Sequence, residues 1–228
     1  MIRAGLTFRE NAAIARELRD DVAQSARDAL TGLPNHRAFF EALRREVSLA
    51  HRHGRELAVV VLDIDGFRSV NQTHGHQAGD VVLTEVAARI ASTLRSEDVL
   101  ARIGGEEFAC LLPSTGGAAA WRAAERARQA VAATPFGQVG EVTVSAGVCD
   151  LSMTEDEAEL VRLANGALYW AKIHGRNVVY RYSPDVMDVL SAEDRAEQAE
   201  RSRTLSAITA LARAVDAKDA TTQRHSER

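Results

Sequence analysis

The chain has 228 residues, a formal net charge of −4 and a hydrophobic fraction of 46%. This fraction is enough to bury a core and excludes a disordered chain, and the slight acidic surplus argues against a general nucleic-acid-binding protein. No apolar run approaches the roughly 18 residues that a membrane span needs, and charged residues between Arg9 and Glu17 interrupt any signal-peptide core. We therefore expect a soluble, cytoplasmic protein with no membrane segment in this chain.

Residues 1–27 have a helical pattern, with apolar residues four apart from Ile14 to Val22. This stripe is too short to distinguish a coiled-coil signalling stalk from a simple amphipathic helix. The stretch DALTGLPN (28–35) breaks the pattern through its Gly and Pro, and its last residue, Asn35, is expected to cap the next helix.

The segment ELAVVVLDID (56–65) has the Val, Leu and Ile content of a central strand that is buried on both faces. A short helix through Phe67 and Val70 and a longer one over residues 78–94 follow. Two apolar runs then flank Gly104-Gly105, which predicts a hairpin because both glycines can adopt a positive φ.

The remaining elements alternate between helix and strand. We expect a helix over 118–133, a strand over 141–150, a helix over 155–175 that Gly175 ends, and a strand over 177–182. From Pro184 onward a long charged helix is expected. Cys110 and Cys149 lie in strand-like runs and are interpreted as small buried hydrophobic residues in a reducing compartment.

Four carboxylates mark the candidate site. Asp63 and Asp65 end the central strand, and Glu106 and Glu107 follow the hairpin glycines. Carboxylates in this arrangement can hold Mg²⁺, and the Ile64 carbonyl can supply a further oxygen. For Asp63 the alternative is a cap at the exit of the strand, but the hairpin acids favour the metal ligand.

The two hairpin acids are expected to differ in role because adjacent residues of a strand point to opposite faces. One of Glu106 and Glu107 would bind metal, while the other would face the substrate or solvent. Gly104 and Gly105 lack Cβ atoms and so allow a nucleotide to lie close to the backbone, although a plain tight turn also explains them.

Five segments together resemble one known family. DALTGLPNHRAF, LDIDGFRSVNQTHGHQAGD, RIGGEEF, VSAGV and ALYWAKIHGRN follow the order and spacing of a GGDEF domain, the family of the diguanylate cyclases. The resemblance covers residues 28–182. It implies an α/β (α+β) fold like that of nucleotidyl cyclases and polymerase palms, with a mainly antiparallel central sheet flanked by helices. It also implies that two GTP molecules are condensed into cyclic di-GMP and two pyrophosphates.

The resemblance also implies roles for individual residues. Asp63, Ile64 and Glu107 would hold Mg²⁺ or Mn²⁺, and Glu106 is similar to the acid considered as a base for the 3′-hydroxyl. The positions that resemble substrate-binding positions of the family are Gly66, Phe67, Arg68, Asn71, Asp80, Gly104, Gly105, Lys172 and Arg176.

Within this set, Asn71 and Asp80 match the positions that bind the guanine edge, which favours GTP over ATP. Arg68 stands where the family usually has Lys. A planar guanidinium with several N–H donors therefore replaces the compact ammonium charge of lysine. Lys172 and Arg176 would contact phosphates; without the resemblance, a solvated helix end would explain them better.

The stretch RSED (95–98) resembles the family's product-inhibition site. Arg95, Asp98 and, from the neighbouring subunit, Arg126 would bind cyclic di-GMP there, and the alternative is a local ion pair between Arg95 and Asp98.

The chain is thus expected to comprise a signalling helix (1–27), a cyclase domain (28–182) and a C-terminal helical segment (183–228). The last segment resembles the start of an HD-GYP phosphodiesterase domain, but contains no His-Asp pair; His225 alone is no metal site. Reciprocal attack by two GTP molecules implies a homodimer. The competing function is a non-catalytic GTP or cyclic di-GMP receptor that regulates a downstream phosphodiesterase domain.

Overall fold

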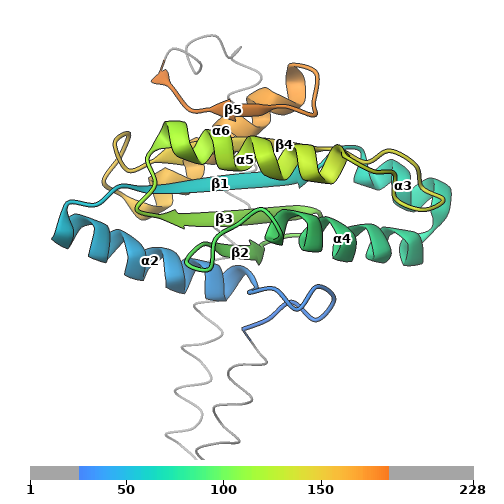
Figure 1. Ribbon diagram of the computed structural model, residues 1–228, viewed down its shortest axis with the longest axis horizontal. Helices are drawn as coiled ribbons and strands as arrows, with labels where there is room; N and C mark the ends of the chain where they lie inside the picture. The colour runs from blue at the N-terminus through green and yellow to red at the C-terminus, as the bar shows by residue number, and fades with distance from the viewer. Residues whose placement is uncertain (1–25, 185–228) are drawn as a thin grey trace, which may run out of the picture. The chain divides into compact units, whose positions relative to one another are not determined.

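The computed structural model describes residues 26–184 (Figure 1). The expected signalling helix and the HD-GYP-like segment therefore lie outside the described residues, apart from their few residues nearest the domain. Among these, Arg27 forms an isolated β-bridge with Pro34, so the predicted helix does not reach residue 27. No helix within 26–184 is long and apolar enough to cross a membrane.

A five-stranded sheet forms the centre of the domain, in the order β2-β3-β1-β4-β5. All neighbouring pairs are antiparallel except β4 and β5, which are parallel. The mainly antiparallel sheet expected from the sequence is therefore confirmed. The strands are β1 (Leu57–Ile64), β2 (Val99–Arg102), β3 (Glu107–Pro113), β4 (Val144–Asp150) and β5 (Val179–Arg181).

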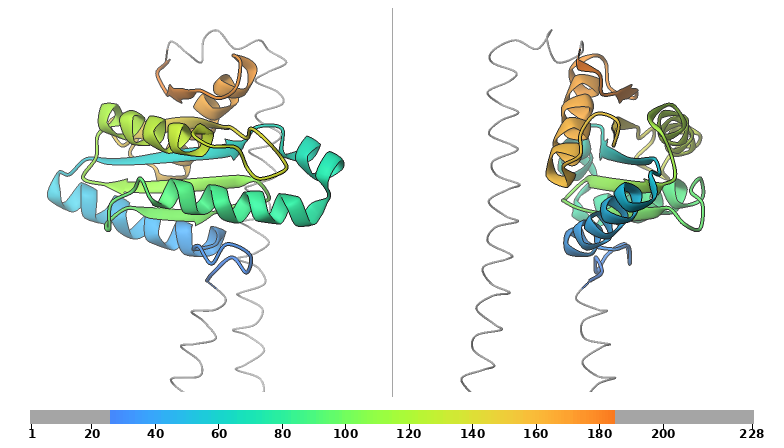
Figure 2. Two further views of the ribbon diagram at one scale, coloured as in Figure 1. Left: turned by 45° about the vertical axis from the view of Figure 1, so that its right-hand side comes forward. Right: turned by 90° about the vertical axis from the view of Figure 1, so that its left-hand side faces the viewer.

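Helices cover both faces of this sheet, with α2 and α6 on one side and α4 and α5 on the other (Figure 2). The side chain of Asn35 caps the first of them by accepting a hydrogen bond from the Ala38 N–H at 3.1 Å, as predicted. The helices are α2 (His36–His53), α3 (Phe67–His74), α4 (His76–Ala91), α5 (Gly117–Ala132) and α6 (Glu157–Ile173).

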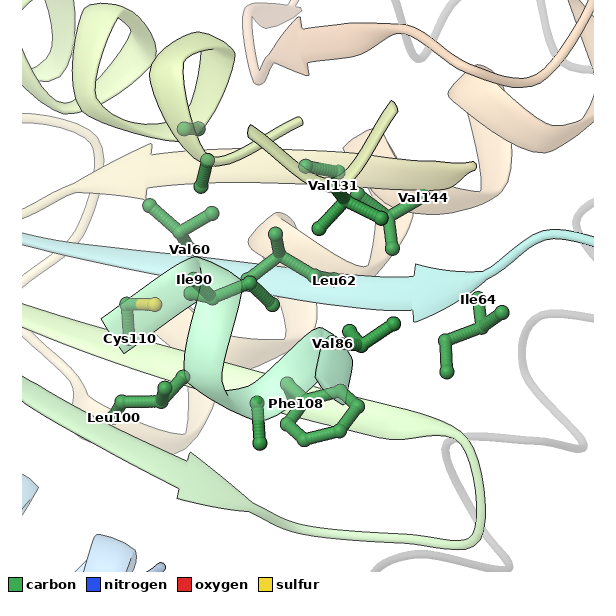
Figure 3. Close-up of a cluster of buried hydrophobic side chains, with 14 of the residues drawn as sticks. Val60, Leu62, Ile64, Val86, Ile90, Leu100, Phe108, Cys110, Val131 and Val144 are labelled. Atoms are coloured by element: carbon green, nitrogen blue, oxygen red, sulfur yellow. The ribbon is translucent and has the colours of Figure 1, made fainter. Parts of the chain in front are cut away.

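The central strand is buried on both faces because side chains of a strand alternate between them. Every residue from Leu57 to Leu62 is at most 1% exposed. Val60 and Leu62 pack with Val86 and Ile90 of α4 (Figure 3), whereas Val59 and Val61 pack toward α2 and α6. The odd-numbered residues of β1 therefore share the α6 face.

Both cysteines are buried and free, as the sequence predicted. Burial raises the thiol pKa of Cys110 and of Cys149, so neither thiolate is available at neutral pH. They serve as small core residues.

Candidate active site

Asp63 and Glu107 are directly opposite each other across the β1–β3 ladder. Directly opposed residues of an antiparallel pair have Cβ atoms about 4.5–5.5 Å apart and point to the same face, and two like charges in this position destabilise the sheet. Strand pairing thereby brings together two carboxylates that are 44 residues apart in the sequence. The pair lies on the α6 face.

Lys172, near the end of α6, supplies a positive charge to this edge of the sheet. Its Nζ atom donates to Asp63 Oδ1 at 2.5 Å and to Asp65 Oδ1 at 2.8 Å, and it lies 3.3 Å from the Asp63 carbonyl oxygen. Burial nevertheless raises the pKa of Asp63, with the charges of Glu106 and Asp65 adding to the effect and Lys172 opposing it. The site therefore holds more negative charge than one lysine neutralises.

Asp65 has a different environment from Asp63. Its carboxylate accepts hydrogen bonds from Thr143 Oγ1 and Ser145 Oγ, each at 2.7 Å, and from the Asn177 N–H at 2.9 Å, in addition to Lys172. Burial alone would raise its pKa, but the hydrogen bonds from Lys172, Ser145 and Thr143 and the charge of Lys172 outweigh burial and hold the pKa of Asp65 below its usual value. Asp65 is therefore a fixed anion in the fold.

Glu106 lies on the other side of the hairpin from the Asp63–Glu107 pair. Its carbonyl accepts from the Ile64 N–H at 3.3 Å, which continues the β1–β3 ladder by one residue. Its side chain lines a pocket of about 470 Å³ together with Phe67 and Arg68 at the start of α3. The two hairpin acids thus face different surroundings.

Asn71 also lines this pocket, and its side chain lies against Gly79 of α4. A Cβ at position 79 would overlap the Asn71 Oδ1 atom and lie 3.2 Å from Cζ of Phe67. Asp80 is the next residue of α4 and is exposed, but it does not line the pocket. The remaining lining residues are Gln72 and His76.

The α3 N-terminus begins at Gly66, whose φ of 68° is left-handed. Its carbonyl accepts from the N–H groups of Ser69 at 2.8 Å and Val70 at 3.2 Å. A side chain at position 66 would be strained, so the tight turn from β1 into α3 requires glycine.

The hairpin predicted at Gly104-Gly105 is confirmed, because β2 and β3 pair antiparallel on either side of it. Neither glycine is among the residues of 26–184 that have a positive φ, so the turn does not use the left-handed backbone that glycine allows. The connection runs from Ile103 to Glu106, and Arg102 stabilises it by donating to the Gly105 carbonyl from Nε at 3.0 Å and Nη2 at 2.7 Å. The Arg102 side chain therefore holds the turn through the Gly105 carbonyl.

Arg102 also joins the hairpin to the start of the domain. Its Nη1 atom donates to both carboxylate oxygens of Asp28, at 3.0 and 3.1 Å, and its backbone N–H donates to the Pro34 carbonyl at 3.0 Å. Gly104 contributes space instead, because a Cβ there would lie 2.7 Å from Oε2 of Glu107.

Comparison with known proteins decides the family. Residues 25–178 match the family model for the diguanylate cyclase, GGDEF domain. The chain belongs to the GGDEF family. This GGDEF chain is 44% identical over 163 residues to diguanylate cyclase DgcP of Pseudomonas aeruginosa, a match that covers 70% of the chain and 24% of DgcP. It is 40% identical over 158 residues to the response regulator PleD of Caulobacter vibrioides, covering 67% of the chain and 35% of PleD.

Solved GGDEF structures have the same fold. The coiled coil and GGDEF domain of DgcB from Caulobacter crescentus, in complex with c-di-GMP, superimposes with a TM-score of 0.73 at 30% identity and covers 78% of this chain and 97% of that one. The active GGEEF domain of a diguanylate cyclase from Vibrio cholerae superimposes with a TM-score of 0.63 at 34% identity, covering 65% and 97%. The fold expected from the resemblance is thus confirmed.

Two positions of the GGDEF chain differ from the arrangement that the sequence suggested. Lys172 lies in the last turn of α6, but Arg176 lies beyond the helix with a left-handed φ of 58°, so the two cations do not share a helix end. In the RSED stretch, the Asp98 carboxylate accepts from the Arg95 backbone N–H at 2.9 Å. Asp98 therefore closes a local turn, and it contacts the backbone of Arg95 where the alternative interpretation had a side-chain ion pair.

The guanidinium groups at the predicted product site remain accessible. Arg95 is exposed on the turn after α4, and Arg126 is exposed on α5. The structure describes a single chain, so a product site that needs a neighbouring subunit stays a prediction.

The residues present are suited to a divalent metal of the kind that GGDEF cyclases generally need. Within residues 26–184, no group of three or more His, Cys, Asp or Glu side chains is arranged to hold a metal ion. Asp63, Glu107 and the Ile64 carbonyl offer oxygen donors only, which suits Mg²⁺ because this ion takes one or two carboxylates and completes its shell with phosphates and water.

Sequence reasoning missed four residues of the site. Arg102 and Asp28 lie within the motifs that carried the resemblance, but nothing in their spacing indicates that they pair. Gln72 and His76 lie within the segment between Asp63 and Asp80, and only their place near Asn71 could have suggested that they line the pocket.

Proposed function

We propose that the protein is a diguanylate cyclase that condenses two GTP molecules into cyclic di-GMP and two pyrophosphates. The observation that carries this proposal is the placement of Asp63 directly opposite Glu107, with Glu106 turned toward the adjoining pocket. The similarity to DgcP and to the cyclase from Vibrio cholerae supports it. Because the chain spans 24% of DgcP and 35% of PleD, the activity of the whole protein is a proposal too.

Asp63, Glu107 and the Ile64 carbonyl would hold Mg²⁺ or Mn²⁺. When bound, such an ion neutralises charge on the triphosphate and on the leaving pyrophosphate. Asp63 and Glu107 contribute two opposed carboxylates on one face, and their mutual repulsion favours a cation between them. Removing either carboxylate would leave the other without its metal-binding partner.

The pocket beside Glu106 would receive the nucleotide. Asn71 and Asp80 would bind the guanine edge, because a carboxylate accepts from the N1–H and the exocyclic amine of guanine, and adenine offers no such donor pair. The backbone N–H groups at Gly66 and Phe67 and the guanidinium of Arg68 would contact phosphate oxygens at the start of α3. Gly104 and Gly105 have no Cβ atoms and would let the nucleotide lie close to the hairpin backbone.

The chemistry needs positioning more than covalent help from the protein. The 3′-oxygen of one GTP forms a bond to the α-phosphorus of the other, the bond to pyrophosphate breaks, and Glu106 accepts the 3′-hydroxyl proton. Each domain would hold one GTP, so turnover requires two domains facing each other as a homodimer. Lys172 and Arg176 would contact the phosphates from the side of α6.

Product would bind at Arg95, Asp98 and a partner's Arg126, and inhibit the enzyme. The exposure of Arg95 and of Arg126 supports this proposal, since both guanidinium groups are available for bidentate contacts with phosphate or guanine. The remaining organisation is proposed on the sequence alone: a signalling helix over 1–27, the cyclase domain over 28–182, an HD-GYP-like beginning in 183–228, and a cytoplasmic location.

One incubation tests the activity. The purified chain is incubated with GTP or ATP in the presence of Mg²⁺ or EDTA, and the products are identified by mass spectrometry. We expect cyclic di-GMP and pyrophosphate only in the incubation that contains GTP and Mg²⁺, and no product with ATP or with EDTA. Tight binding of GTP or cyclic di-GMP without any product would refute the cyclase and support the regulatory receptor, and a cyclic product from ATP would refute the guanine assignment.

A further inference from the structure

Four hydrogen-bond donors converge on the carboxylate of Asp65. Oδ1 accepts from Lys172 Nζ at 2.8 Å and Ser145 Oγ at 2.7 Å, and Oδ2 accepts from Thr143 Oγ1 at 2.7 Å and the Asn177 N–H at 2.9 Å. A carboxylate has about four lone-pair positions, so all of its accepting capacity is used. Asp65 has no lone pair left for a metal ion.

Burial makes this saturation necessary. The Asp65 side chain is only 7% exposed, and an ionised carboxylate at this depth is costly unless it is paired and hydrogen-bonded. Asp63, two residues earlier, accepts only from Lys172 among the described residues and is 19% exposed. The two aspartates therefore differ in role. Asp63 keeps lone pairs that can still accept a hydrogen bond or bind a metal ion, whereas Asp65 holds its hydrogen-bond donors in place.

The turn after α6 depends on the same carboxylate. Arg176 and Asn177 have left-handed φ values of 58° and 49°, which cost residues other than glycine about 1–3 kcal/mol each and persist only where the surroundings hold them. The Arg176 N–H donates to the Ala171 carbonyl at 3.1 Å, the Asn177 N–H donates to Asp65, and Arg128 of α5 donates to Asn177 Oδ1 at 2.6 Å. These contacts fix the turn that carries Arg176.

We infer that Asp65 is a positioning residue for phosphate binding: it holds the ammonium of Lys172 and the turn of Arg176 where they meet the triphosphate. This inference rests on the proposed cyclase function. Its physical basis is that Lys172 contacts both aspartates. If Asp65 no longer attracts it, Lys172 is left to Asp63 alone and moves toward the carboxylate proposed for the metal.

The Asp65→Asn substitution separates charge from shape. The amide keeps the size of the carboxylate, but replaces one acceptor oxygen by an NH₂ donor that faces two other donors. A double-mutant cycle in the full 228-residue chain then compares wild type, Asp65→Asn, Lys172→Met and the double variant by kcat/KM for GTP. We expect each single change to lower kcat/KM at least 10-fold, and the combined loss to be at least 5-fold smaller than the product of the two.

A merely structural role for Asp65 gives a different result in this cycle, because losses that arise independently multiply. Multiplicative losses would overturn the inference. If the wild-type chain forms no cyclic di-GMP from GTP, the cyclase proposal fails by itself, and the binding experiment below still decides the role of Asp65.

Binding of 3′-deoxy-GTP in EDTA, measured by calorimetry, removes both the chemistry and the metal. We expect Asp65→Asn to weaken binding at least 5-fold and Asp150→Asn to leave it unchanged, since Asp150 is a similarly buried carboxylate at the far end of β4. Equal binding by Asp65→Asn and wild type would overturn the inference.

A milder variant covers the case in which Asp65→Asn fails to fold. Ser145→Ala removes one donor and leaves the carboxylate and Lys172 in place, and thermal unfolding shows whether the fold is kept. We expect 3′-deoxy-GTP binding to weaken 2- to 5-fold. Unchanged binding by a folded Ser145→Ala variant would count against Asp65 as the positioning residue.

Discussion

The side chain of Asn71 on α3 occupies the space that Gly79 leaves open on α4. Glycine in the interior of a helix costs roughly 1 kcal/mol relative to alanine, so its presence here calls for a local reason. That reason is the Oδ1 atom of Asn71, which a Cβ at position 79 would overlap. Gly79 therefore lowers the stability of α4 locally, but it leaves room for the side chain of Asn71 at the pocket.

Gly79→Ala is expected to keep or slightly raise the thermal stability of the domain and to raise the KM for GTP about 10-fold. The gain comes from helix propensity, and the loss comes from displacement of Asn71. Steady-state kinetics with GTP and a melting curve measure both effects. In an Asn71→Ala background, Gly79→Ala should have little further effect on KM; a full additional 10-fold increase would show that Gly79 acts through some other contact.

Asp63→Asn and Glu107→Gln are each expected to lower cyclic di-GMP formation at least 1,000-fold, because each removes one of the two opposed carboxylates proposed for the metal. Glu155→Gln, on an exposed loop residue, is the matched control and should retain wild-type turnover. Product is quantified by mass spectrometry at saturating GTP and Mg²⁺. Substantial synthesis by either site variant would contradict the metal assignment.

Arg102→Lys is expected to lower kcat/KM about 10-fold and to destabilise the domain by about 2 kcal/mol. The reason is that lysine loses the planar fork that bonds the Gly105 carbonyl and Asp28 at once. Arg122→Lys, at an exposed position of α5, controls for the same change of residue type. Denaturant unfolding and GTP turnover are measured together, and equal behaviour of the two variants would argue against the clamp.

The contribution of Asp28 to stability should depend on pH. Burial alone would raise the pKa of Asp28, but hydrogen bonds from Thr31 and Arg102 outweigh it and lower that pKa below the ordinary value of 3.8. A depressed carboxyl pKa means that the stabilisation is present above pH 3.8 and is lost as the pH falls through the folded-state value.

The Asp28→Asn variant checks this sign. Its deficit in free energy of unfolding, about 1 kcal/mol, should be full between pH 5 and 7 and should shrink as the pH falls below about 4. Urea unfolding of both proteins across this range gives the difference directly. A deficit that grows toward acid would reverse the assigned direction of the shift.

Arg95→Ala is expected to raise the half-inhibitory concentration of cyclic di-GMP at least 10-fold, since charge-assisted hydrogen bonds to phosphate are worth about 1.5–3 kcal/mol. Titrating product into the wild type and the variant under initial-rate conditions measures the shift. Arg122→Ala supplies the control for loss of a surface charge. The same inhibition curve for Arg95→Ala and wild type would place product binding elsewhere.

The strand from Leu57 to Ile64, the cap at Asn35 and the buried cysteines could all be predicted locally, because a continuous apolar run, a capping side chain and an apolar neighbourhood are visible in short windows of sequence. The hairpin at Gly104-Gly105 could be predicted in the same way, but its contacts could not. Arg102 donates to the Gly105 carbonyl and to Asp28, and these contacts form only when the start of the domain lies beside the hairpin.

The sequence by itself determined the family, the identity of the acids and the order of the elements, since these follow from residue type and spacing. Only the tertiary structure decided which acids meet: antiparallel pairing of β1 with β3 sets Asp63 opposite Glu107, and the packing of α6 brings Lys172 to Asp63 and Asp65. Strand register and helix packing are long-range properties. The different surroundings of Asp63 and Asp65, two residues apart, are therefore absent from any local pattern.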